Sequence, residues 1–227
     1  MSGGCDNVRM GEYEGELESV RVARVLREEI IIGDREPGTR LVERDIAAAM
    51  NVSRLPVREA IKQLAAEGMV IAKPRSGAVV RQFTLQDIDD FAELREAIET
   101  LTFVLAAKRH TPEGLAALRE VIDRQRAAVG ADDLRGAWSA SSDFHILVTR
   151  LAGNAMVNEM VAGMAPRLRW IFGHHEDLAG MVEAHEAIFA AVEQRDTERV
   201  RGLVIDHLES GRQEAIERLN ARTMWSI

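Results

Sequence analysis

Apolar residues recur at helical spacing in residues 54–64, so that one face is apolar and the opposite face carries Arg58. A second helical pattern occupies residues 41–50, and Asn51 between the two tolerates the left-handed conformation that a tight helix-to-helix turn requires. The later helix can therefore bury one side while it presents cations on the other. This arrangement predicts a helix-turn-helix, whose second helix reaches bases or phosphates in a DNA major groove.

The start of the second helix has its own chemical signals. Ser53 stands at the N-cap position, where its hydroxyl can accept a bond from an otherwise unpaired backbone N–H. Pro56 falls in the first turn, where a missing N–H has no cost. Arg54 and Leu55 lie near the exposed side, so this end of the helix offers a cation and a short apolar tip to DNA.

Two β-prone runs, residues 69–72 and 78–81, flank a polar turn at residues 73–77 that contains Pro and Gly. A hairpin in this place is expected to form the wing of a winged helix. Before the helix-turn-helix, residues 16–32 have the pattern of an amphipathic helix that ends at Gly33, the residue type usual at that position.

After the wing the chain shows helical patterns and no strand pattern. Six helices are predicted, at residues 86–109, 112–129, 132–152, 155–173, 176–194 and 197–220, and Thr84 and Asp87 are spaced as a capping box before the first. We therefore predict a mostly α protein, with an N-terminal winged helix-turn-helix and a C-terminal all-α helical bundle. The expected domains are a disordered tail at 1–15, a DNA-binding domain at 16–83 and an all-helical domain at 84–227.

The charge is distributed unevenly between the two halves. The net charge of −8 resides in residues 84–227, with 16 basic and 24 acidic residues, whereas residues 1–83 have 13 of each. Within residues 41–81 the count is 7 basic to 4 acidic. A locally basic helix on an acidic molecule predicts reliance on specific DNA contacts, made twice by a homodimer on a palindromic operator.

The composition, 46% hydrophobic and 29% charged, is that of a globular protein. No apolar run approaches the roughly 20 residues of a membrane span, and the first 15 residues lack the pattern of a secretion signal. We expect a cytoplasmic protein without a membrane partner. The single cysteine, Cys5, excludes an internal disulfide and is expected to be an incidental exposed thiol.

The run from Leu26 to Phe83 resembles the winged-helix domain of GntR-type bacterial transcription regulators. The resemblance is carried, in unbroken order, by IIG at 31–33, PGTRL at 37–41, ERDIA at 43–47, VSRLPVREA at 52–60, EGMV at 67–70 and GAVV at 77–80. Leu55 departs from it, because the family usually has Thr there. The resemblance implies DNA contacts from the recognition helix and the wing, at Arg44, Ser53, Arg54, Leu55, Pro56, Arg58, Lys73, Arg75 and Gly77.

Nearly all of residues 86–220 resembles the FadR-type C-terminal effector domain, called FCD, that often follows a GntR winged helix. The matching motifs are LREAIE at 94–99, DFH at 143–145, AGN at 152–154, EAHEAI at 183–188, RD at 195–196 and DHL at 206–208. The resemblance implies that this domain binds a small organic acid.

Three histidines, His145, His185 and His207, lie on apolar helix faces and are expected to point inward. Imidazole is a common ligand of Zn and Ni, although from the residues alone a hydrogen-bonded core histidine is the more frequent case. The resemblance implies that all three are ligands of a divalent metal, together with an Asp one turn before the first. Ser141 stands at that position, so the expected site has three imidazoles completed by water or by a carboxylate of the effector.

Arg95 could pair with the carboxylate of an effector, or with Glu99 four residues later in a surface salt bridge. Ser141 is expected beside the same ligand. Arg167 and Arg169 could also bind a carboxylate, but surface salt bridges are favoured for them.

His174 and His175 are adjacent in a predicted loop, and we expect them to be solvated because neighbouring residues do not share a face.

These observations together predict a DNA-binding transcriptional regulator, expected to be a repressor, whose operator affinity depends on an organic acid and on Zn or Ni in the helical domain. Ligand binding is expected to act through the junction at residues 81–87 on the spacing of two winged helices. Two alternatives remain: a sensor of metal alone, and a metal-dependent hydrolase in which the three imidazoles hold an ion that activates water. The hydrolase is disfavoured because no general base is evident and the winged helix would have no purpose.

Overall fold

The computed structural model describes residues 16–73 and 77–224. The chain divides into two compact units, Met1–Arg81 and Gln82–Ile227. The predicted tail at 1–15, with Cys5, and the wing residue Arg75 lie outside the described residues.

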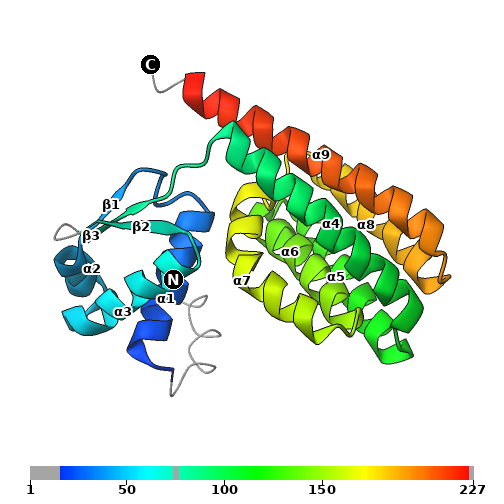
Figure 1. Cartoon of the computed structure of the whole chain (residues 1–227), viewed down its shortest axis with the longest axis horizontal. Helices are drawn as coiled ribbons and strands as arrows, with labels where there is room; N and C mark the ends of the chain where they lie inside the picture. The colour runs from blue at the N-terminus through cyan, green and yellow to red at the C-terminus, as the bar shows by residue number, and fades with distance from the viewer. Residues whose placement is uncertain (1–15, 74–76, 225–227) are drawn as a thin grey trace, which may run out of the picture. The chain divides into compact units, whose positions relative to one another are not determined.

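The first unit is a winged helix-turn-helix (Figure 1). In chain order its elements are α1 (Glu18–Ile31), β1 (Arg40–Leu41), α2 (Glu43–Met50), α3 (Arg54–Ala66), β2 (Val70–Lys73) and β3 (Gly77–Val80). The three strands form an antiparallel sheet in the order β1-β3-β2. Its core contains the inward-facing positions of α1 and α3 and residues of the sheet: Val22, Leu26, Ile30, Leu41, Val57, Leu64 and Val80.

Local backbone geometry agrees with the sequence signals at two turns. Asn51 adopts φ 53° and ψ 49° between α2 and α3, and Gly33, just after α1, has φ 89°. Ser53 occupies the predicted N-cap position with extended backbone, but its hydroxyl makes no capping hydrogen bond, so that part of the prediction is wrong. The helix begins there nonetheless, because α3 packs its apolar face against the core.

The strand β1 was not predicted from the sequence. It has two residues, Arg40 and Leu41, paired with Val79 and Ala78 of β3, and so short a segment has no alternating pattern to read. Gly77 has φ 88°, and a Cβ there would clash with the carbonyl oxygen of Leu41. The close approach of β1 to β3 therefore requires glycine at this position.

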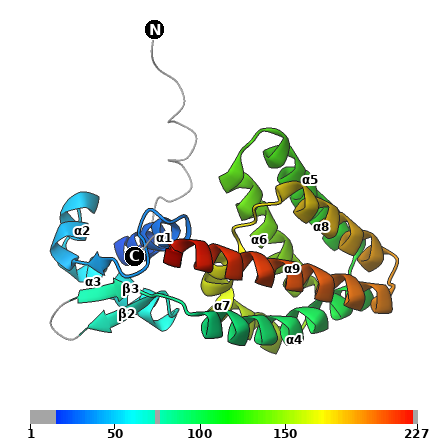
Figure 2. The same ribbon diagram turned by 90° about the horizontal axis from the view of Figure 1, so that it is seen from above.

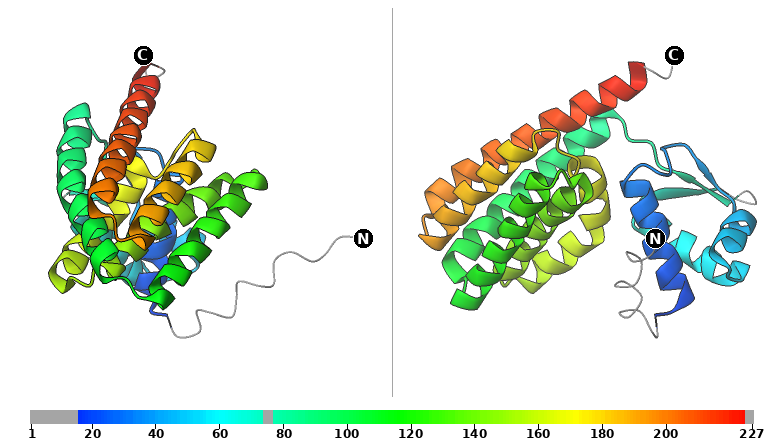
Figure 3. Two further views of the ribbon diagram at one scale, coloured as in Figure 1. Left: turned by 90° about the vertical axis from the view of Figure 1, so that its right-hand side faces the viewer. Right: turned by 180° about the vertical axis from the view of Figure 1, so that it is seen from behind.

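The second unit is all helical, and the prediction of a mostly α protein with a small β wing is confirmed. Its helices are α4 (Leu85–Arg109), α5 (Pro112–Gly130), α6 (Leu134–Leu151), α7 (Ala155–Phe172), α8 (Leu178–Glu193) and α9 (Thr197–Met224). The long helices α4 and α9 lie side by side (Figure 1, Figure 2), and α5 packs along α6 (Figure 3).

The helix starts in this unit follow from side-chain caps. Thr84 and Asp87 form the predicted capping box, with the Thr84 amide donating to Asp87 (2.8 Å) and the Asp87 amide donating to the Thr84 hydroxyl (3.1 Å). Thr111 and Asp196 accept amide hydrogens in the same way at α5 and α9. No helix in the described part of the chain is long and apolar enough to cross a membrane.

The main hydrophobic core of the bundle lies between α4, α5, α6, α8 and α9, with Phe103, Phe144, Ile188 and Val204 fully buried in it. A smaller core near the start of α4 includes Ile88, Phe172 and Ala215. The three predicted metal ligands lie among these helices, on α6, α8 and α9, and face one another.

Candidate functional site

His145, His185 and His207, here called the triad, converge inside the bundle from three different helices. Their potential ligand atoms all lie within 4.8 Å of one another. The Nε2 atoms of His145 and His207 are 3.2 Å apart. Two nitrogens bound to one tetrahedral zinc at about 2.0–2.1 Å stand about 3.3 Å apart, so this pair already has the separation that a shared metal ion requires.

Two other buried side chains set which ring nitrogen carries the hydrogen in two members of the triad, His145 and His185. Glu99 Oε2 is 2.6 Å from His145 Nδ1, and Gln125 Oε1 is 2.8 Å from His185 Nδ1. Because both oxygens accept hydrogen bonds, each Nδ1 carries the hydrogen and each Nε2 presents its lone pair. Metal-bound histidines typically use their other ring nitrogen in this way.

The Nε2 atom of His185 is buried, and no group in the described residues hydrogen-bonds to it. A buried acceptor without a partner costs about 1–3 kcal/mol. A divalent ion held jointly with His145 and His207 would satisfy it. The residues present therefore fit a metal site, with Ser141, fully buried on α6 one turn before His145, in place of an acidic ligand.

Burial also favours the neutral form of the three imidazoles. It lowers the pKa of His145, and it lowers the pKa of His185 and His207 well below the ordinary value, with the neighbouring imidazoles and Arg95 adding to the effect. For Glu99 burial alone would raise the pKa, but Arg95 and His145 outweigh it and hold the pKa of this carboxyl far below its usual range. Neutral imidazoles beside an ionised carboxylate are what a metal site needs.

Arg95 does pair with Glu99, through Nε to Oε1 at 2.6 Å, but the pair is buried, with 6% and 8% of the two side chains exposed. Of the two alternatives for Arg95, the pair with Glu99 is present, but it lies inside the bundle and not on the surface, because α4 packs this face inward. The other end of the guanidinium, Nη2, lies 3.4 Å from His145 Nε2. Arg95 is thus a cation at the edge of the triad.

Arg167 and Arg169 occupy the second half of α7 and are half-buried. The Arg167 guanidinium lies 5.0 Å from the centre of the Phe91 ring, in cation–π geometry.

The loop between α7 and α8 corrects another prediction. His175 is buried, 6% exposed, and not solvated. Its Nδ1 lies 3.3 Å from Glu214 Oε2, its ring centre is 6.3 Å from that of His207, and Trp138 Nε1 donates to its backbone oxygen at 3.0 Å. Each of these partners is distant in sequence, so a reading of the loop by itself could not find them. His174 is half-buried, edge-on to the Trp138 ring.

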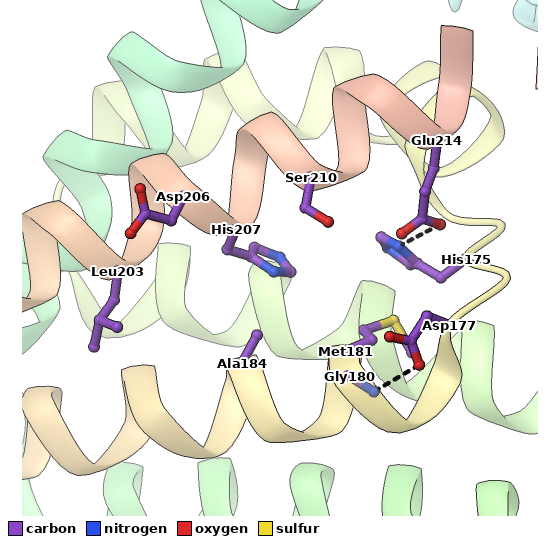
Figure 4. A pocket seen from close by; sticks show the side chains of 10 residues that line it. All are labelled: His175, Asp177, Gly180, Met181, Ala184, Leu203, Asp206, His207, Ser210 and Glu214. Atoms are coloured by element: carbon purple, nitrogen blue, oxygen red, sulfur yellow. Dashed lines mark hydrogen bonds and ion pairs between the residues drawn. The ribbon is translucent and has the colours of Figure 1, made fainter. Parts of the chain in front are cut away.

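A cavity of about 270 Å³ lies between α8 and α9, next to His207 (Figure 4). His175 and Glu214 line one end of it, and Ala184 and Leu203 lie on its helical walls (Figure 4). The triad and this cavity share His207 as a common wall.

Sequence reasoning missed four residues as partners of the histidines: Glu99, Gln125, His175 and Glu214. One signal was available for Gln125, a polar residue among the buried apolar positions of α5. The other contacts depend on which helices pack together.

In the first unit, several of the residues predicted to contact DNA lie together at the exposed start of α3. Leu55 is 64% exposed, as is the Arg54 side chain, and Arg58 is 51% exposed. Both arginines pair with Glu43 of α2, at 3.4 and 3.0 Å. Hydrogen bonding with Arg58 lowers the pKa of Glu43, and the same bond raises the pKa of Arg58.

The remaining predicted DNA contacts are spread around this cluster. Arg44 on α2 has an 82% exposed side chain that pairs with Asp45, and Lys73 is exposed at the end of β2. Pro56 is half-buried in the first turn of α3. Gly77 has the structural role at β3 described above.

An exposed basic recognition helix beside a β hairpin, followed by an all-helical domain, is the architecture of a DNA-binding transcription regulator. Residues 18–80 match the family of bacterial regulatory proteins named gntR, and residues 90–210 match the FCD domain. The chain belongs to the GntR family of DNA-binding transcriptional regulators, in the group that carries an FCD domain.

Known proteins that are similar to this chain are also transcriptional regulators. The chain is 28% identical over 193 residues to the HTH-type transcriptional repressor RspR of Escherichia coli, covering 83% of this chain and 85% of RspR. It is 30% identical over 199 residues to the gluconate operon transcriptional repressor of Bacillus subtilis, and the match covers 83% of this chain and 79% of that repressor. The solved structure of E. coli McbR/YncC has the same fold, with a TM-score of 0.76, 21% identity and coverage of 91% and 99%. These relatives and both matched domains are those of regulators, not enzymes, which confirms that the protein is not an enzyme.

Proposed function

We propose that this regulator is a repressor whose operator affinity is set by a small organic acid bound next to a divalent metal, Zn or Ni, in the helical domain. The observation that carries the proposal is the triad: three neutral imidazoles from three helices, two of them oriented by Glu99 and Gln125, with a buried unpartnered Nε2 at His185. Such an arrangement has a cost in folding unless a ligand completes it.

The metal would be held by His145, His185 and His207 and would supply a Lewis-acidic centre that binds a carboxylate oxygen. Ser141 offers only a hydroxyl, a weak ligand for a divalent ion, so the protein supplies no charge of its own to the ion at that position. An effector carboxylate would provide the missing negative charge.

The position of Arg95 supports an organic acid. Its guanidinium lies 3.4 Å from the His145 nitrogen that would bind the metal. Two cations so close repel each other unless an anion lies between them, and a carboxylate bridging the ion and Arg95 would relieve the repulsion. One relative is named as the repressor of a gluconate operon, and gluconate is an organic acid.

At the DNA end, Arg44, Arg54, Leu55, Arg58, Lys73 and Arg75 would contact the operator, with Ser53, Pro56 and Gly77 shaping the surface that carries them. A palindromic operator bound by a homodimer would double these contacts. The relative RspR is named a repressor. Because its partner is chromosomal DNA, the protein would act in the cytoplasm.

The junction offers a route between ligand and DNA. Phe83 lies edge-on to Phe91 of α4 and Trp170 of α7, with ring centres 6.2 and 4.8 Å apart. Movement of α4, which carries Arg95 and Glu99, would shift Phe83 and with it the connection to β3. Effector binding would in this way alter the spacing of the two winged helices.

The test is made on the full-length protein. Zinc added after chelator treatment should raise the melting temperature of the wild type by several degrees, since a ligand that binds only the folded state stabilises it. His185→Ala should abolish the rise, whereas His110→Ala, a buried histidine outside the triad, should retain it. An equal rise in His185→Ala and wild type would refute the metal site.

Operator affinity separates the remaining possibilities. If zinc alone changes the affinity for operator DNA at fixed salt, the protein is a sensor of metal. If an organic acid is also needed, the effector proposal stands. An operator affinity that no metal and no acid alters would refute the regulation proposed.

A further inference from the structure

Glu43, the first residue of α2, joins the two arginines at the start of α3. The two helices pack against each other (Figure 1). One carboxylate oxygen of Glu43, Oε1, accepts a hydrogen bond from Arg58 Nε at 3.1 Å, and the other, Oε2, accepts one from Arg58 Nη2 at 3.0 Å. Arg54 Nη2 donates to the same Oε2 at 3.4 Å. One carboxylate therefore holds both side chains, and it holds Arg58 through two bonds of nearly equal length.

The carboxylate is better enclosed than the arginines that it holds. The Glu43 side chain is 20% exposed, whereas those of Arg54 and Arg58 are 64% and 51% exposed. Most surface ion pairs stabilise a protein little, but a bidentate pair fixes the guanidinium in one orientation. The hydrogen bond with Arg58 is the main cause that lowers the pKa of Glu43, so the carboxyl is ionised at neutral pH.

The bonds to Glu43 determine which edge of the Arg58 guanidinium remains for a ligand. A guanidinium has five N–H donors in a rigid plane. Glu43 occupies the side edge, with the Nε–H and one Nη2–H, and the end edge, with Nη1 and the second hydrogen of Nη2, is not part of the pair. Two parallel N–H donors on one edge match the O6 and N7 acceptors of a guanine in the major groove. Arg58 is thus held with a guanine-binding edge outside the ion pair.

The negative charge of Glu43 acts in the same direction. A phosphate attracts any cation within reach, whereas a base needs donors in one orientation. A carboxylate beside Arg54 and Arg58 offsets part of their positive charge and repels phosphates, which weakens binding that does not depend on sequence. Fixed orientation and reduced charge both favour contacts with bases over contacts with phosphates.

We propose that Glu43 is a positioning residue for DNA recognition, which aligns the guanidinium of Arg58, and less firmly that of Arg54, so that Arg58 contacts a guanine of the operator. The assignment rests on the proposed function, because it requires α3 to contact the bases of the operator. It adds the base that Arg58 recognises and the residue that aligns Arg58 for it.

The first experiment identifies the guanine. Full-length wild-type protein selects its preferred sites from a duplex library with a randomised centre. In a selected site each guanine is replaced in turn by 7-deazaguanine, which pairs with cytosine but has C–H in place of the N7 acceptor. Replacement of the guanine that Arg58 contacts should weaken wild-type binding about fivefold or more. Arg58→Ala should bind the substituted and unsubstituted sites equally well at that guanine.

The second experiment changes Glu43 in two ways. Glu43→Gln removes the charge and leaves one acceptor oxygen where two are used, and Glu43→Asp keeps the charge on a side chain one methylene shorter. Both variants should bind the substituted and unsubstituted sites with affinities within about twofold of each other. Only Glu43→Gln should bind random DNA more tightly than the wild type. Melting temperatures show which variants are folded, and either variant alone tests the alignment of Arg58.

Glu59→Gln is the matched control for charge. Glu59 lies on α3, pairs with Lys62 at 2.9 Å and acts on Arg58 through its charge, but it accepts no hydrogen bond from Arg58. Its replacement removes the same charge from the same surface. Glu59→Gln should therefore bind random DNA more tightly, as Glu43→Gln does, and retain the full effect of 7-deazaguanine.

The outcomes separate this inference from the proposed function. If the Glu43 variants retain the full effect of 7-deazaguanine, Glu43 acts through charge alone and the inference is wrong. If no guanine replacement weakens wild-type binding more than it weakens binding of Arg58→Ala, Arg58 contacts no guanine; the inference is again wrong, while operator binding stands. If the selection yields no preferred sequence, operator recognition in the proposed function fails and this inference fails with it.

Discussion

Glu99 holds the candidate metal site in place, and Glu99→Gln is the substitution that tests its role most directly. One carboxylate oxygen binds His145 Nδ1 and the other binds Arg95 Nε, each at 2.6 Å. The variant keeps the shape of the side chain but removes its charge. Its amide presents one oxygen and one NH₂ group to two hydrogen-bond donors, so one of the two contacts is lost.

Two magnitudes follow from this geometry. Removing one partner of a buried ion pair leaves Arg95 uncompensated, which costs about 3–5 kcal/mol of unfolding free energy in the metal-free protein. Loss of the group that orients His145 lowers metal affinity by about 10–100-fold, or about 1.4–2.7 kcal/mol. The two effects are separable because the first is measured without metal.

The assay pairs urea unfolding in the presence of chelator with zinc affinity from competition against a chromophoric chelator, both on the full-length protein. Asp143→Asn is the matched control, a carboxylate two residues from His145 that is 42% exposed and pairs with Arg124 on the surface. It should change the unfolding free energy by less than about 1 kcal/mol and leave zinc affinity unaltered.

Unchanged zinc affinity in a folded Glu99→Gln protein would refute the reasoning, because His145 would then need no carboxylate behind it. If the variant does not fold, Gln125→Met poses the same question at His185 without removing a charge.

Three further predictions concern pH and DNA. Folding lowers the pKa values of His185 and His207, so below about pH 6.5 the unfolded chain binds more protons than the folded protein. The unfolding free energy of the metal-free protein should therefore have its full value above that pH. It should fall as the pH drops through about 6.5, by up to about 1.4 kcal/mol per pH unit for each histidine. Urea unfolding across pH 5–8 checks this, and a flat profile would contradict it. Arg58→Ala should lower the free energy of binding to the operator by about 1–3 kcal/mol and change binding to random DNA little. Lys73→Ala should weaken binding to operator and random DNA alike, and it should reduce the slope of log affinity against log salt concentration by about 1. Binding titrations at several salt concentrations measure both effects. Glu43→Gln should raise affinity for random DNA, because it removes a carboxylate beside two exposed arginines. If the variant and the wild type bind random DNA equally well, Glu43 does not weaken the contacts of these arginines with DNA.

Local sequence signals determined which segments form helices, which face of each helix is buried and where several helices begin and end. The 3.6-residue period alone orients one face of α3 inward, and Asn51, Gly33, Thr84 and Asp87 mark turns and helix ends that the structure contains. These features depend on residues within a few positions of one another, so a linear reading captures them. The same period placed three histidines on inward faces, and the resemblance to the FCD domain implied that the three belong to one site.

Tertiary structure alone decided the rest. Glu99 reaches His145 across 46 positions, and Gln125 reaches His185 across 60. The burial of His175, the ion pair of Arg95 inside the bundle and the pairing of β1 with β3 likewise depend on which elements pack together. Helical periodicity fixes the direction of a side chain but not the helix it meets, and hydrogen-bond partners and pKa values are set by that neighbour.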